Sequence, residues 1–313
     1  MNGGSLMGKT VYMFPGQGAQ YIGMGKEFYE QQEVCKSVFD MASNVTGLDI
    51  AALCFEENEK INQTEYTQIA MLTVEAAIFM AMEQQNLKPD YTAGLSLGEY
   101  GALIASKVLD PKDAFAVIRQ RGIFMQDAVP TGGGMSAVMG LDADAVEAAC
   151  GKVDGVVSVA NYNCPGQIVI TGEIKAVELA GQACKEAGAK RVIPLNVSGP
   201  FHSKMLEEAG KKLAEELKKV QVYPIAVPYV SNVTADFVTD QSKVCELLQK
   251  QISSPVRWQQ SIELMIQNGA DEFVEIGPGH TLSGFLKKID RSKTVYHIEK
   301  PEDLEAYVQG HRK

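Results

Sequence analysis

The chain has 313 residues and a mass of 33.9 kDa, with 45% hydrophobic and 22% charged residues, so it can form one large domain plus a smaller one around a substantial core. Its formal net charge of -10 and pI near 5.0 argue against a surface for nucleic acid or anionic membranes, because such a surface needs an excess of cations to neutralise phosphates.

Six cysteines are scattered along the chain without C-x-x-C pairs or a grouping with histidine. We interpret them as reduced thiols and expect neither disulfides nor a metal site. No apolar stretch is long enough to cross a bilayer, and the opening MNGGSLMGKT lacks the basic start and apolar middle of a secretory signal. These features predict a soluble, cytoplasmic protein, whose natural start could be Met7.

The first predicted elements alternate between strand and helix. A β-rich apolar run at residues 10–14 leads into the turn PGQGAQ and then a helical pattern near residues 28–44. A second helical pattern covers residues 67–87, and PDYTAGLSLGEYGALIASKVL then repeats the order of short strand, sharp turn and helix. This alternation predicts a mostly parallel sheet with helices on both faces.

The pattern changes from about Met135 to shorter units. Strands are predicted at MSAVMG, VSVANYN, QIVITG and AKRVIPL, with helices at residues 142–151 and 173–188. The resulting order β-α-β-β-α-β is that of a ferredoxin-like module. Beyond Gly199 the longer units resume, with strands at PYVSN and DEFVEIG and helices near residues 203–219, 255–268 and 281–289.

The predicted fold class is therefore α/β, with two parts. Residues 1–130 and 199–313 form a large α/β-hydrolase-like subdomain with a mostly parallel sheet, and residues 131–198 form a ferredoxin-like subdomain inserted into it.

The segment from Gly94 to Gly98 fits G-x-S-x-G, with Ser96 at its centre, a strand before it and a helix after it. In a nucleophile elbow this strand-turn-helix exposes the serine hydroxyl, and the glycines let neighbouring backbone approach closely. The alternative is a serine that caps a helix in a glycine-rich turn. The flanking elements favour a nucleophile.

A serine nucleophile needs a base, and the chain has four histidines: His202, His280, His297 and His311. His280 follows GPG, where a turn explains it, and two others lie close to the C-terminus. His202 lies in the loop SGPFHSKM before a helical pattern, where its ring can point into a cleft. It is the best candidate for the base.

Arg121 lies on the apolar stripe of the helix that begins at Asp110 and Pro111. A guanidinium on such a face does not stay buried without a partner. The partner is either a carboxylate of the protein, in a structural ion pair, or an anionic ligand that the planar guanidinium binds with two hydrogen bonds.

The turn PGQGAQ lacks the lysine and spacing of a phosphate-binding loop. It is either a structural turn or, because it follows the first strand, part of the oxyanion hole of a sheet enzyme.

Six segments in this order resemble the malonyl-CoA:acyl carrier protein transacylases: FPGQGAQ, GLSLGEY, RGIFMQDAVP, NYNCPGQ, GPFHS and EIGPG. The resemblance extends from about Val11 to Ile289 without large gaps. It implies an acyltransferase that carries malonyl from malonyl-CoA to acyl carrier protein through a malonyl-serine intermediate, without cofactor or metal. We expect fatty acid synthesis as the pathway and a monomer as the oligomeric state.

The resemblance also implies roles for individual residues. Ser96 would be the nucleophile, His202 its base and Arg121 the partner of the malonyl carboxylate. The oxyanion hole would consist of Gln17 and the backbone N–H of Leu97. The histidine would be oriented by a backbone carbonyl and not by an aspartate, at the position of Gln251 in this chain. Asn161 and Asn163 would line the cleft from the small subdomain, and Phe201, beside the histidine, would contact the acyl group.

Leu95 departs from the family, which usually has histidine before the nucleophile. Leucine makes no side-chain hydrogen bond, so the details of acyl recognition are open. Three alternatives remain at this point: a serine thioesterase or hydrolase on the same scaffold, a malonyltransferase of a polyketide pathway, and an inactive carrier-binding protein. Lys204, Lys211 and Lys212 are candidates for contact with an acidic carrier.

Overall fold

The computed structural model describes residues 8–311. Six strands form a large sheet in the order β10-β9-β1-β2-β7-β8, parallel except for the β7–β8 pair. These strands are β1 (Lys9–Phe14), β2 (Tyr91–Gly94), β7 (Tyr229–Val230), β8 (Phe237–Val238), β9 (Ala270–Ile276) and β10 (Thr294–Ile298). The predicted mostly parallel sheet is confirmed.

Helices cover both faces of the large sheet, as its central strand requires. Tyr12 and Phe14 of β1 face one core and Val11 and Met13 face the other, so no side of this strand meets solvent. The core on the first face contains side chains from α1 (Lys26–Gln31), α2 (Glu33–Thr46), α3 (Ile50–Phe55), α4 (Thr64–Gln84), α5 (Gly98–Ala105), α6 (Pro111–Ala128), α9 (Glu207–Leu217), α10 (Val244–Gln251) and α13 (Pro301–His311). The second packs against α11 (Trp258–Gln267) and α12 (Thr281–Ile289).

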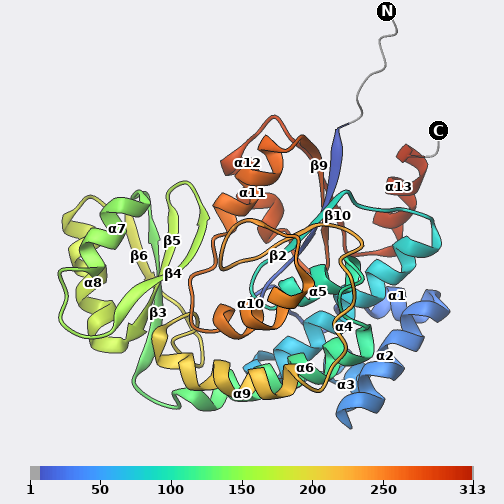
Figure 1. The fold of residues 1–313 in the computed structure, drawn as a ribbon, viewed down its shortest axis with the longest axis horizontal. Coiled ribbons are helices and arrows are strands. Elements are labelled where there is room, and N and C mark those ends of the chain that lie inside the picture. Colours follow the sequence, from blue (N-terminus) through green and yellow to red (C-terminus); the bar gives the residue numbers. More distant parts are fainter. Residues whose placement is uncertain (1–7, 312–313) are drawn as a thin grey trace, which may run out of the picture.

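A small antiparallel sheet forms a separate lobe with two helices on one face (Figure 1). Its order β4-β5-β3-β6 places β5 between β3 and β4, the split arrangement of the predicted ferredoxin-like module. The lobe consists of β3 (Gly133–Met139), α7 (Ala143–Cys150), β4 (Val157–Cys164), β5 (Gln167–Glu173), α8 (Ile174–Glu186) and β6 (Arg191–Pro194).

The structure corrects several predicted helices. The helix expected near residues 28–44 is two helices, because Gln32 has the extended angles φ -131° and ψ 117°. The helix expected at residues 67–87 begins earlier, at Thr64, and ends before Asn86, whose positive φ cannot continue a helix. The pattern at residues 203–219 begins with a 3₁₀ turn before α9.

The carboxyl ends of β1, β2 and β9 meet at one edge of the large sheet, which is where open α/β sheets bind their ligands. The turn PGQGAQ, the Ser96 turn and the GPGH segment follow these three ends. No helix among residues 8–311 is both long and apolar enough to cross a membrane. The proposed start at Met7 lies outside the described residues.

Candidate active site

Ser96 lies at the turn between β2 and α5 with φ 56°, a left-handed conformation that is uncommon for serine. The two flanking glycines are required by close backbone contacts. A Cβ on Gly94 would lie 1.9 Å from the carbonyl of Gly98, and one on Gly98 would lie 2.2 Å from the carbonyl oxygen of Phe14. The sequence therefore uses two glycines around one serine to close a sharp turn against β1.

His202 provides a partner for the serine hydroxyl. Its Nε2 lies 2.8 Å from Ser96 Oγ, and its Nδ1 lies 2.9 Å from the carbonyl oxygen of Gln251 and 3.2 Å from that of Ser254. Because a carbonyl only accepts, Nδ1 carries the proton and Nε2 is free to accept from the serine. His202 also has a positive φ, 59°, so both members of this pair have strained backbone.

Arg121 of α6 is fully buried beside this pair. One terminal nitrogen donates to Ser96 Oγ at 3.1 Å and to Gln251 Oε1 at 2.9 Å, and the other donates to Gln68 Oε1 at 2.6 Å. Its Nε has no hydrogen-bond partner. Among the described residues no carboxylate forms an ion pair with Arg121, so its charge is not neutralised by a direct protein contact.

Gln251 connects these groups to a buried carboxyl. Its Nε2 donates to Glu99 Oε2 at 2.6 Å and to the Ser96 carbonyl oxygen at 3.0 Å, which turns Oε1 toward Arg121. Asn232 joins the same network, because its Oδ1 accepts from Ser96 N–H at 2.7 Å and its Nδ2 donates to the Gly94 carbonyl at 2.7 Å. One amide side chain thus holds both sides of the elbow.

Burial determines the protonation of two of these groups. Burial and the nearby Arg121 charge lower the pKa of His202 to about 4, so its imidazole is neutral near pH 7. Burial raises the pKa of Glu99 to about 7, against the opposing effect of its hydrogen bond from Gln251. A neutral histidine with a free Nε2 beside a serine hydroxyl is competent as a general base.

The predicted oxyanion donors flank the elbow. Leu97 is fully buried, and no hydrogen bond within residues 8–311 uses its backbone N–H. The Gln17 side chain donates to Thr64 Oγ1 at 3.1 Å, which fixes it on the start of α4. Gly16 lies so close to the elbow that a Cβ on it would meet Leu95 at 2.7 Å. The PGQGAQ turn thus packs against the residue that precedes Ser96.

The other predicted cleft residues lie around the histidine. Phe201 precedes His202 and is 7% exposed. Asn161 and Asn163 are buried on β4, whose backbone pairs with Val256, just after the segment that holds the His202 ring. Within residues 8–311, no hydrogen bond joins either asparagine side chain to Ser96, His202 or Arg121. The structure therefore brings Ser96, His202, Arg121 and Gln251 into direct contact and places these three at the periphery.

Sequence analysis did not identify Gln68, Glu99 or Asn232. Gln68 had a recognisable signal, because it is one of three polar residues, with Thr73 and Glu75, in the mostly apolar run QIAMLTVEAAIFMAM of a helix that is buried on nearly all sides. Asn232 had a weaker one, since it follows the carboxyl end of β7.

The site has the features of a nucleophile-elbow enzyme on an α/β sheet. A strand leads into a turn with a strained serine, a helix follows, and a histidine is hydrogen-bonded to the serine hydroxyl. Comparison with known proteins identifies the class more closely. The acyl transferase domain family matches residues 11–299. The malonyl CoA-acyl carrier protein transacylase of Bacillus subtilis (strain 168) is 45% identical over 308 residues, covering 97% of each chain.

Solved structures agree with this. The transacylase MCAT from Streptococcus pneumoniae is 46% identical, with a TM-score of 0.93 over 96% of this chain and 100% of that one. A malonyl-transacylase in complex with its holo type II PKS acyl-carrier protein is 37% identical, with a TM-score of 0.94 over 97% of this chain and 100% of that one. The chain belongs to the acyl transferase domain family and, within it, to the malonyl CoA-acyl carrier protein transacylases.

Proposed function

We propose that this acyltransferase moves a malonyl group from malonyl-CoA to the phosphopantetheine thiol of acyl carrier protein, with Ser96 as the covalent carrier. The observation that supports the dicarboxylic substrate is the buried Arg121 guanidinium, which lies 3.1 Å from Ser96 Oγ without a carboxylate partner in the described chain. A buried cation of this kind favours binding of an anionic ligand.

In the first half-reaction His202 Nε2 takes the proton of Ser96 Oγ as the oxygen attacks the malonyl thioester carbonyl. The C–S bond breaks, the protonated His202 returns its proton to the leaving thiolate, and coenzyme A departs. Backbone N–H groups at Leu97 and Gln17 would stabilise the oxyanion, each such donor being typically worth roughly 10²–10³ in rate.

In the second half-reaction the carrier thiol gives its proton to His202 and attacks the malonyl-serine ester. The C–O bond breaks, and the proton passes from His202 to Ser96 Oγ, which restores the enzyme. The carboxylate of the malonyl group stays paired with Arg121 throughout, so both half-reactions use one orientation of the acyl group.

The carbonyl partners of His202 distinguish this proposal from a serine hydrolase. Hydrolases with a nucleophile elbow orient their histidine with an Asp or Glu that follows the serine in the chain. Here Nδ1 faces the carbonyl oxygens of Gln251 and Ser254 instead. The geometry therefore favours transfer to a thiol over hydrolysis.

The decisive test is the ratio of malonyl to acetyl transfer in Arg121→Ala. Loss of the charge-assisted pair should cost malonyl transfer about 1.5–3 kcal/mol, or roughly 10–150-fold, and acetyl transfer much less. Arg121→Lys should restore only part, because an ammonium lacks the planar two-pronged geometry. An unchanged ratio would refute the clamp.

Arg119→Ala is the matched control, since this arginine lies on the same helix and already has a carboxylate partner, Glu65, at 2.7 Å. Its removal should change both transfer rates alike. Melting temperatures of the two variants, measured in parallel, separate loss of the substrate contact from loss of stability.

We further propose that the enzyme supplies fatty acid synthesis in the cytoplasm. The higher identity to the Bacillus subtilis transacylase than to the type II PKS one supports the pathway. Six free thiols, in each of which burial raises the pKa, suit a reducing compartment. Residues 131–198 act in this proposal as a small subdomain beside the large one formed by residues 1–130 and 199–313.

A further inference from the structure

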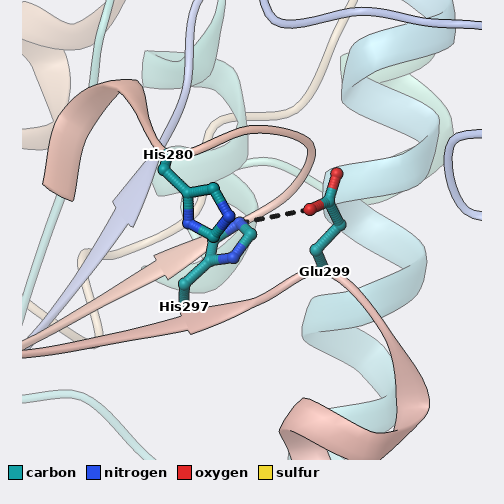
Figure 2. Close-up of side chains that lie close together, drawn as sticks. All are labelled: His280, His297 and Glu299. Atoms are coloured by element: carbon teal, nitrogen blue, oxygen red, sulfur yellow. Dashed lines mark ion pairs between the residues drawn. The ribbon is translucent and has the colours of Figure 1, made fainter. Parts of the chain in front are cut away.

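Two histidines and a glutamate converge at the carboxyl ends of β9 and β10, apart from the Ser96 turn. Within residues 8–311 they are the one set of three His, Cys, Asp or Glu side chains whose donor atoms all lie within 4.8 Å of one another: His280, His297 and Glu299. Figure 2 shows the two imidazole rings against each other and the carboxylate pointing toward them. The ring centroids are 3.8 Å apart, and His297 Nε2 lies 3.9 Å from Glu299 Oε2.

The hydrogen bonds leave donor atoms available at the centre of this cluster. Glu299 Oε1 accepts from Tyr21 Oη at 2.8 Å and from Gly279 N–H at 3.1 Å, which fixes the carboxylate, whereas Oε2 accepts none from the described residues. Neither ring nitrogen of His280 has a hydrogen-bond partner within the described chain. Metal sites commonly have this organisation, in which one carboxylate oxygen is held by an outer partner and the other binds the ion.

We propose that His280, His297 and Glu299 bind a divalent transition-metal ion of the zinc type. Two imidazoles and one carboxylate are a ligand set that suits Zn²⁺, with water completing a tetrahedron. Zinc–ligand bonds of about 2.0–2.2 Å place the donors of a tetrahedron roughly 3.4 Å apart. Binding therefore requires the 3.9 Å between His297 Nε2 and Glu299 Oε2 to shorten slightly and the exposed His280 to move inward.

The carbonyl oxygen of Gly277 lies 3.0 Å from His297 Nε2 and accepts its proton in the metal-free form. Metal binding at Nε2 moves that proton to Nδ1 and replaces the hydrogen bond with a coordination bond.

The site would act on structure and not on the acyl transfer itself. Gly277 and Gly279 pack so closely on the PGQGAQ turn that a Cβ on them would meet Pro15 and Ala19 at 3.0 and 3.3 Å. An ion bound by His280 and by His297 of β10 would therefore hold the GPGH segment in place. The PGQGAQ turn, which contains the proposed oxyanion donor Gln17, packs against this segment. This inference does not depend on the proposed reaction.

The experiment titrates the full-length, chelator-treated enzyme with Zn²⁺ by calorimetry and follows the melting temperature. We expect one ion per chain and a rise in melting temperature. His280→Ala and Glu299→Gln should each weaken binding by at least tenfold, about the smallest loss seen when even outer partners of a metal site are removed. Tyr21→Phe, which keeps all three ligands, should weaken it by about tenfold.

Two variants provide matched controls. His311 also pairs with a glutamate, Glu272 at 2.9 Å, but has no second histidine ligand, and His202 lies in the active site. Neither His311→Ala nor His202→Ala should change zinc affinity. No binding up to about 1 mM Zn²⁺, unchanged affinity in His280→Ala, or loss of binding in either control would overturn the proposal. The His280 substitution alters only an exposed side chain, so a folded variant is expected for this comparison.

Discussion

Two groups of polar side chains follow strand ends at the same edge of the large sheet, and they are built in opposite ways. Around Ser96 the histidine and arginine are buried, and a network of amides and carbonyls holds them. Around His297 the side chains are partly exposed, and Glu299 Oε2 accepts no hydrogen bond from the described residues.

The difference shows how environment selects chemistry for the same residue type. Burial and a fixed partner set the tautomer of His202 and keep it neutral, which suits proton transfer. The His280 ring, in contrast, is exposed beside the His297 ring and has no hydrogen-bond partner within the described chain. Its nitrogen lone pair is therefore free to bind an external cation. The following predictions test this contrast, beginning with the largest effect.

Ser96→Ala should abolish covalent malonyl-enzyme, because the hydroxyl is the proposed attacking group and no other serine contacts His202 Nε2 within the described chain. The measurement is the intact mass after incubation with malonyl-CoA. Ser283→Ala, which removes a buried hydroxyl on the β9–α12 side, is the control and should keep the adduct. A malonyl adduct on Ser96→Ala would place the nucleophile elsewhere.

His202→Ala should slow both half-reactions by roughly 10²–10⁴-fold, the usual contribution of a positioned acid–base group. The proposed base, His202, accepts a proton only when its ring is neutral. Because its pKa is held near 4, kcat/KM should stay level from pH 8 down to about 5 and fall only below that. A fall centred near pH 6.5, the ordinary histidine value, would show that the ring is less buried than the structure has it.

The same shift affects stability. The unfolded chain binds a proton at His202 below about pH 6.5, whereas the folded protein excludes it until about pH 4. The lowered pKa of His202 therefore decreases the free energy of unfolding as the pH falls from about 6.5 to about 4. Glu99 acts in the opposite direction, as its raised pKa makes the folded state the better proton binder between pH 4.5 and about 7.

Much of the fold was predictable because local pattern and final environment agree. The small lobe, for instance, has strands that alternate on one covered face and short helices with clear ends, and its four strands and two helices were all predicted. The break at Gln32 was not, because the apolar pattern runs on across it. Residues 244–251 and 294–311 received no prediction, although they contain α10, β10 and α13.

The candidate site was predictable where a motif or an unusual residue marked it. Ser96 has its glycines, His202 its loop and Arg121 its place on an apolar stripe. Glu99 had no such mark, since its role depends on Gln251, 152 positions away in the chain. The cluster at His297 was missed for the same reason, because its ligands come from the ends of two different strands and the search for metal ligands rested on cysteine spacing.

Glu99 should prove to be a positioning residue. Glu99→Ala removes the acceptor that orients the Gln251 amide, so transfer should fall by about tenfold, the equivalent of one lost hydrogen bond to a charged group. Glu99→Gln keeps an acceptor oxygen at the same place and should restore most of the rate. Equal losses in both variants would indicate that the charge, and not the hydrogen bond, is what matters.

The pH dependence of stability tests whether the buried Glu99 titrates in the folded protein. Ionisation of the buried Glu99 should lower the melting temperature of the wild type relative to that of Glu99→Gln as the pH rises from 4.5 through about 7, a comparison in which the opposite effect of His202 is common to both proteins. Glu99→Gln cannot ionise, so its melting temperature should decline less over that range. A parallel decline in both proteins would exclude Glu99 as the titrating group.

Leu95→His should have the smallest effect, and it tests the contrast most directly by placing a partly exposed imidazole next to the elbow. Leu95 is half-buried against Gly16, and histidine is the residue usual at this place in the family, so the fold should be retained at a cost of about 1 kcal/mol or less. Because the new ring would be neither fully buried nor held by two carbonyls, it should titrate near the ordinary histidine pKa of about 6.5, unlike His202. The variant's pH–rate profile should therefore gain a shallow inflexion near pH 6.5 that the wild-type enzyme lacks, with a change in hydrolysis of the malonyl-serine ester measured as decay of the intact-mass adduct. A profile identical to the wild type, in a folded variant, would mean that an imidazole beside Ser96 does not influence the ester, and that the acid–base chemistry of this edge belongs to the buried His202 alone.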